Sequence, residues 1–121
     1  MVKLLQTNNP DGGPRIPVVV DIRSGSVDVT KVEITRGDNE GSTRAFHAAV
    51  GFDTSAALFP EGASRGFYVE VYVLTEGWVA TMQDVLTVEK ESDIGKSWDD
   101  LVTTSGGDGP IHAVLVKTWF E

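Results

Sequence analysis

Two apolar runs separated by only two residues constrain this chain more than any other feature. Residues 67–75 and 78–88 are rich in β-branched and aromatic side chains, and the dipeptide Glu76-Gly77 lies between them. Two such runs around a two-residue loop that contains glycine are typical of a β-hairpin. The sequence therefore predicts two antiparallel strands over residues 67–88.

The predicted hairpin specifies its own register. If Glu76-Gly77 is the loop, Thr75 faces Trp78 and the cross-strand pairs follow outwards from there. One face then collects the pairs Phe67/Leu86, Val69/Asp84, Val71/Met82 and Val73/Ala80. The other face collects Tyr68/Val85, Glu70/Gln83, Tyr72/Thr81 and Leu74/Val79. We expect the first face to lie on the core, where burying each large apolar side chain contributes about 1.5–3 kcal/mol.

The first half of the chain also alternates between apolar and polar residues, which predicts further strands. We expect a short edge strand over residues 2–6 and a strand over 16–22 with one apolar face. The apolar parity changes between Val29 and Val32, which indicates a bulge or break near Thr30-Lys31.

Residues 42–50 allow two interpretations. As a strand, Phe46, Ala48 and Val50 would pair back on the face of Val32 and Ile34. As a helix, the segment would use its three alanines and a Ser42 cap. We prefer the strand because the cross-strand parity agrees.

The remaining segments complete the expected architecture. Residues 53–59 are predicted to form a short helical segment capped by Asp53 or Thr54, and Ser97 is expected to cap a helical turn over 98–102. Residues 111–120 are apolar on both sides, which predicts a central strand. The sequence predicts a single, mainly β domain over residues 1–121. We expect an antiparallel sandwich or partly open barrel of about seven strands, with one or two short helical turns.

Composition excludes several classes of partner and chemistry. The chain has 121 residues, no cysteine and a formal net charge of −8, so a disulfide framework is excluded. We expect neither nucleic acid nor anionic membranes as partners, because an acidic surface repels both. The sequence shows neither a signal-peptide pattern nor an apolar run of membrane-spanning length, and we expect a cytoplasmic protein.

The motifs that could carry catalysis do not meet their structural requirements. Gly62-Ala63-Ser64-Arg65-Gly66 matches the pattern of a serine nucleophile, but a strand follows it where the mechanism needs a helix. The only two histidines, His47 and His112, have no second ligand at metal spacing. No residue is assigned a catalytic, cofactor-binding or metal-binding role, and the sequence favours a protein that is not an enzyme.

Two candidate sites remain, both built on the hairpin. The outward face of the hairpin is amphipathic and aromatic, a composition that suits a protein interface. Its members are Tyr68, Glu70, Tyr72, Thr81 and Gln83. Asp84 falls on the apolar face opposite Val69, where an unpaired carboxylate would be costly. This predicts a bulge or an exposed strand end, a cation or hydrogen-bond donor that meets Asp84, or a pocket lined by Asp84, His47 and His112.

Three functions are compatible with these features. The first is a small acidic binding or assembly protein that forms a homo-oligomer, or binds a protein partner, through sheet faces or edges. The second is a small-molecule-binding or small-molecule-processing domain with its pocket near Asp84. The third is an acidic inhibitor or immunity-type protein that uses the acidic residues between 89 and 100.

Overall fold

The computed structural model describes residues 1–23, 27–36, 46–55, 57, 64–94 and 109–121, and the backbone of 97–102. In chain order its elements are β1 (Val2–Thr7), β2 (Ile16–Ile22), β3 (Asp28–Arg36), β4 (Phe46–Asp53), β5 (Arg65–Thr75), β6 (Trp78–Val88), the 3₁₀ turn η1 (Glu91–Asp93), β7 (Ser97–Val102) and β8 (Ile111–Phe120).

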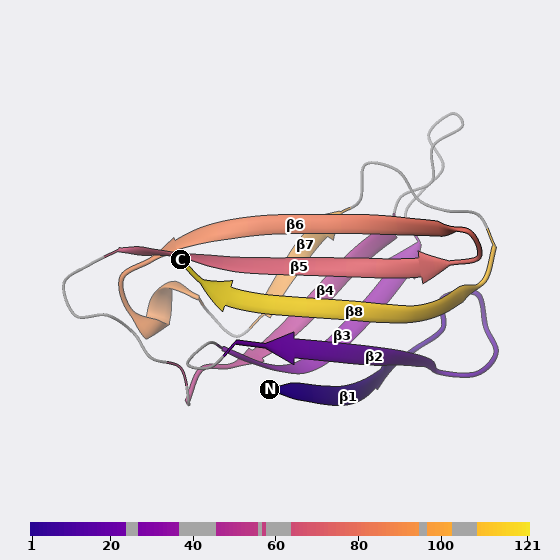
Figure 1. Ribbon diagram of the computed structural model, residues 1–121, viewed down its shortest axis with the longest axis horizontal. Coiled ribbons are helices and arrows are strands. Elements are labelled where there is room, and N and C mark those ends of the chain that lie inside the picture. Colours follow the sequence, from indigo (N-terminus) through magenta and orange to yellow (C-terminus); the bar gives the residue numbers. More distant parts are fainter. Residues whose placement is uncertain (24–26, 37–45, 56, 58–63, 95–96, 103–108) are drawn as a thin grey trace.

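These strands form two layers (Figure 1). A five-stranded sheet has the order β1-β2-β8-β5-β6, and a three-stranded sheet has the order β3-β4-β7. The sheets are not closed into a barrel. Of the two architectures expected from the sequence, the mainly β sandwich is confirmed.

The predicted hairpin is confirmed residue by residue. Strands β5 and β6 pair antiparallel from Thr75↔Trp78 outwards to Phe67↔Leu86 and beyond, without a register shift. Gly77 has a φ of 73°, a conformation that glycine adopts without strain. The predicted core face is also correct, because Phe67, Val69, Val71, Val73, Ala80 and Met82 are all buried.

The interpretation of β3 and β4 as paired strands is likewise confirmed. Val32 pairs with Val50 and Ile34 with Ala48, and the register shifts between Val29 and Lys31. The shift leaves Thr30 as the extra residue of a bulge, which explains the change of apolar parity. Residues 42–45 lie outside the described part of the chain.

The sheet is antiparallel except at one pair. Strand β8 is central, as predicted, but it runs parallel to β2 and antiparallel to β5. This parallel pair is an exception within the antiparallel arrangement that the sequence predicts. Residues 16–22 and 111–120 are separated by most of the chain, so no turn signal between them indicates their relative direction.

The predicted helical turn over 98–102 is wrong, because residues 97–102 form β7, an edge strand paired with β4. A helix of six residues forms too few hydrogen bonds to offset the cost of nucleation, whereas β4 offers backbone groups with which a strand can pair.

A short helical segment was also predicted over residues 53–59. In the structure Asp53 is the last residue of β4, and its Oδ1 accepts a hydrogen bond from the backbone N–H of Ser55 at 2.9 Å. A turn follows, in which the N–H of Ala57 donates to the carbonyl of Thr54. Residues 58–60 lie outside the described part.

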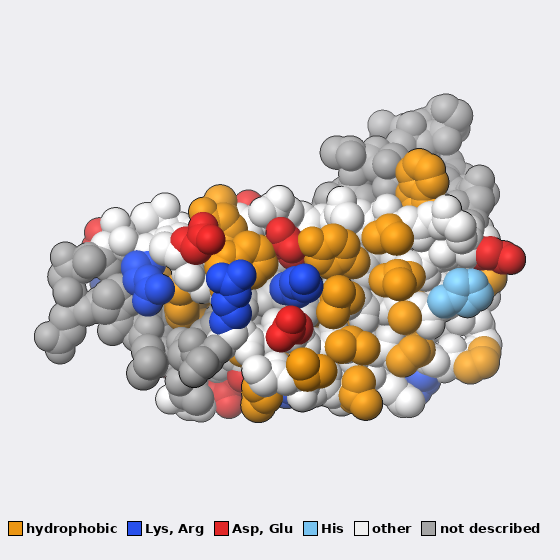
Figure 2. All heavy atoms as spheres, viewed as in Figure 1, with side chains coloured by type: hydrophobic (Ala, Val, Ile, Leu, Met, Phe, Trp, Pro, Cys, Tyr) orange, Lys and Arg blue, Asp and Glu red, His pale blue; other side chains and the backbone are white. Residues whose placement is uncertain are grey.

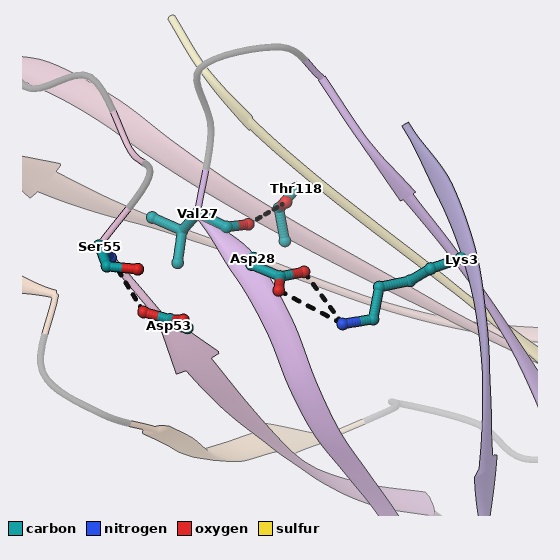
Figure 3. Close-up of polar contacts among 6 residues, drawn as sticks. All are labelled: Lys3, Val27, Asp28, Asp53, Ser55 and Thr118. Carbon is teal, nitrogen blue, oxygen red and sulfur yellow. Dashed lines mark hydrogen bonds and ion pairs between the residues drawn. The ribbon is translucent and has the colours of Figure 1, made fainter.

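The core fills the space between the two sheets. Alternate residues of β2, β3, β4, β5 and β8 point into it and are buried. Polar links also join the layers (Figure 3): Lys3 of β1 pairs with Asp28 of β3, with Nζ and Oδ1 3.2 Å apart. The buried Thr118 hydroxyl of β8 donates to the carbonyl of Val27 at 3.1 Å. The three-stranded sheet thus covers one face of the five-stranded sheet, and no described strand covers the opposite face.

Candidate functional site: the outer face of the five-stranded sheet

The outer face is defined as the side chains of β1, β2, β8, β5 and β6 that point away from the three-stranded sheet. All five interface residues predicted from the sequence lie on it. Tyr68, Glu70 and Tyr72 are partly buried and alternate with the fully buried Val69, Val71 and Val73, while Thr81 and Gln83 are exposed. The hairpin register therefore places these residues together as predicted.

Two apolar rows cross this face at right angles to the strands. The pairings align the first row as Leu4, Val19, Leu115, Tyr72 and Thr81. In the second row, Ala113 of β8, Leu74 of β5 and Val79 of β6 are aligned. Leu4 is 76% exposed and Val79 is 54% exposed. Figure 2 shows apolar side chains gathered over this half of the sheet, with the charged side chains beside them.

A charged row borders the apolar rows. Asp21, Lys117 and Glu70 are aligned across β2, β8 and β5, so a lysine is flanked by two acids. Among the described residues, no ion pair within 4.0 Å involves any of these three side chains. Together with Arg23, Thr118 and Trp119 they line a shallow pocket of about 250 Å³. This row can therefore form ion pairs with a second molecule.

An aromatic stack lies next to the charged row. The rings of Tyr68 and Trp119 are parallel within 6°, with centroids 5.1 Å apart, and the Arg23 guanidinium lies 5.4 Å from the Trp119 centroid. Gly66 makes room for this stack, because a Cβ there would lie 2.7 Å from Cε2 of Tyr68. Both rings are partly exposed, and partly exposed aromatic side chains are typical of contact residues.

Tyr72 and Glu70 form a hydrogen-bonded pair at the border between the apolar and charged rows. The Tyr72 hydroxyl donates to Oε2 of Glu70, and Lys117 Nζ lies 5.9 Å from the centre of the tyrosine ring. This hydrogen bond, together with partial burial and the negative charge of Glu70, raises the pKa of Tyr72 above its usual 10.0. Tyr72 is therefore neutral and oriented by Glu70.

This pair gives a testable pH dependence. We expect an ionisation step above pH 10.0 in the absorbance of the protein at 295 nm, absent from Tyr72→Phe. Glu70→Gln removes the charge that opposes the phenolate and should shift the step to lower pH. Because the folded-state pKa is raised, the stability from this hydrogen bond is present below pH 10 and lost as pH rises through the folded value. A step that stays in place in Glu70→Gln would contradict the assignment.

The structure does not bring the three predicted pocket residues together. Asp84, His47 and His112 are all exposed. Asp84 lies in the cross-strand row of Val69 and Thr118, six residues or about 20 Å along β8 from His112. His47 belongs to the other sheet and alternates with the buried Phe46 and Ala48, so it faces away from the core. Asp84 avoids the cost of burial because β6 is the edge strand of the wider sheet.

The acidic connector has a structural use within the described residues. Oδ2 of Asp93 accepts hydrogen bonds from the backbone N–H groups of Glu89 and Lys90, at 2.9 and 3.1 Å. These two bonds lower the pKa of the Asp93 carboxyl. Asp93 therefore stabilises η1, whereas Glu89 and Glu91 are exposed.

Sequence reasoning missed half of the outer face. Five further residues join the hairpin residues there only because β8 pairs with both β2 and β5. They are Asp21, Arg23, Leu115, Lys117 and Trp119. The sequence shows that residues 111–120 are apolar on both sides. Only the strand order shows that the outer side of this strand continues the surface of the hairpin.

Neither a metal site nor a membrane-spanning helix is found among the described residues. Within the described ranges, no group of three or more His, Cys, Asp or Glu residues could hold a metal ion. In the same part of the chain, the helical structure is too short and too polar to cross a membrane. No family model, characterised protein or solved structure matches this chain.

Proposed function

We propose that this chain is a small, acidic, non-enzymatic assembly protein that self-associates through the outer face of its five-stranded sheet. The observation that carries this proposal is the ordering of the face into separate apolar, charged and aromatic rows that run across neighbouring strands. A second copy can match such rows one by one.

The matching follows from the register. A two-fold axis parallel to the strands, between β8 and β5, places each residue of β8 over its own cross-strand partner on β5 of the second copy. Lys117 of each copy then lies over Glu70 of the other, and Leu115 lies over Tyr72. At these central positions of β8 and β5, opposite charges meet and apolar side chains meet, as an isologous interface requires.

The area available sets the expected strength. With the axis between β8 and β5, the strands β2, β8, β5 and β6 face one another and β1 lies outside the overlap. Four strands about 4.8 Å apart and six residue steps of about 3.3 Å give a plane of about 380 Å² per copy. Two copies then bury about 760 Å², which is typical of a weak interface. We therefore expect a weak association that depends on concentration.

Sedimentation equilibrium of the wild-type chain and of Leu115→Lys tests the proposal. The wild type should form dimers as concentration rises, and Leu115→Lys should remain monomeric, because it places a charge in the middle of an apolar row. Thr35→Lys is the matched control, since it adds the same charge at an exposed position on the other sheet. A wild type that stays monomeric at about 1 mM would exclude the proposal, because its dimerisation would then contribute less than about 4 kcal/mol.

A charge swap tests the axis itself. Lys117→Glu and Glu70→Lys each place like charges together across the two-fold axis, so each variant should be monomeric when alone. Mixed together, the two variants restore both ion pairs, and a heterodimer should form. Homodimers of either variant, or no heterodimer in the mixture, would show that Lys117 and Glu70 do not meet across the interface.

A further inference from the structure

Among the described strands, none pairs with the outer edge of β6 in the five-stranded sheet. It is 11 residues long, and Asp84 is its one ionisable residue. Trp78 is 52% exposed and Val85 is 49% exposed on the same strand. A long, apolar edge with a single charged residue is the kind of surface to which a further strand adds by backbone hydrogen bonds.

The hairpin geometry shows which backbone groups point to this free edge. The pair next to a two-residue loop, Thr75 and Trp78, is hydrogen-bonded, and the pairs then alternate. Even-numbered residues of β6, including Asp84, therefore direct their N–H and C=O groups to β5. Odd-numbered residues from Val79 to Thr87 direct theirs to the free edge.

The Asp84 side chain occupies one of these edge groups. Its Oδ1 accepts a hydrogen bond from the backbone N–H of Val85 at 2.8 Å. Val85 is odd-numbered, so its N–H is an edge donor. The N–H of Val85, which an added strand would use, is therefore already bonded to the Asp84 carboxylate, and the negative charge of that carboxylate lies beside it.

The sequence of β6 is otherwise complementary to a second copy of itself. Antiparallel pairing centred on Gln83 places Thr81 opposite Val85 and Val79 opposite Thr87 of the partner strand. On the other face, Ala80 meets Leu86. The misfit is Asp84, which meets Met82 and lies diagonal to the second Asp84, where two carboxylates repel each other.

We propose that the free edge of β6 is a second self-pairing surface, which fits β6 of another copy in antiparallel register, and that Asp84 keeps this surface closed. The proposal is independent of the outer-face interface, because it concerns backbone groups in the plane of the sheet. Asp84 determines that self-association uses the face and not the edge.

Amide hydrogen exchange of Asp84→Thr tests this inference. In the wild type, the edge amides of Thr81 and Gln83 should exchange much faster than those of Ala80 and Met82. In Asp84→Thr, exchange at Thr81, Gln83 and Val85 should slow at least tenfold as concentration rises. The same comparison in the Leu115→Lys background removes any contribution from the face. Glu76→Gln, which removes one negative charge at the hairpin tip, is the control and should behave as the wild type.

A proline variant tests the direction of the donor. Val85→Pro removes an N–H outside the β5–β6 ladder, so the thermal midpoint should change little. Combined with Asp84→Thr, it should abolish the concentration-dependent slowing. The proposal would be overturned if Asp84→Thr showed the same amide exchange and the same sedimentation as the control Glu76→Gln. So would a wild type whose Thr81 and Gln83 amides are as protected as those of Ala80 and Met82.

Discussion

Phe67→Ala is expected to lower the free energy of unfolding by about 3–5 kcal/mol. Phe67 is fully buried on β5, where its ring lies 5.4 Å from Phe52 at an interplanar angle of 82°. Its centroid is also 5.4 Å from that of Phe120 on β8. Because Phe52 belongs to the three-stranded sheet, truncation of Phe67 opens a cavity between the layers and removes two aromatic contacts.

Urea denaturation followed by circular dichroism measures this loss. Val85→Ala is the comparison, because Val85 is about half exposed on the same hairpin and its truncation should change stability by no more than about 0.5 kcal/mol. Equal losses for the two variants would mean that Phe67 does not join the two layers.

Thr118→Val is expected to destabilise the protein by about 1–3 kcal/mol, although it preserves the shape of the side chain. Thr118 is fully buried, and its hydroxyl donates to the carbonyl of Val27 just before β3. Valine has no hydroxyl group, so the buried carbonyl of Val27 loses the hydrogen bond that Thr118 donates to it.

Thr118→Ser separates the hydroxyl from the methyl group. Serine keeps the donor and loses one methyl group, which costs about 1 kcal/mol by burial alone. We expect Thr118→Val to lower the thermal midpoint more than Thr118→Ser does, because only the valine variant loses the hydrogen bond to Val27. The reverse order would assign the role of Thr118 to packing alone.

The sequence was sufficient where neighbouring segments determine the structure. The register of the hairpin, the bulge at Thr30 and the pairing of Ile34 with Ala48 all follow from apolar parity across short loops. The five interface residues share a face for the same reason.

The sequence was insufficient where distant segments meet. Nothing near residues 97–102 indicates that β4 accepts them as a strand, and nothing local makes β8 parallel to β2. The structure likewise does not bring Asp84, His47 and His112 together, because these strand positions lie far apart in the fold. Asp84 was singled out correctly as unusual, but its surroundings depend on β6 being an edge.

The position of β8 between β2 and β5 has a consequence for biosynthesis. Residues 111–120 supply the only strand, among those described, that joins β1-β2 to the β5–β6 hairpin within the sheet. While the ribosome is still making these residues, the hairpin and β1-β2 remain separate pieces with unsatisfied backbone edges. Folding of the wider sheet must therefore follow translation of β8, and the nascent chain is most exposed to aggregation just before that point.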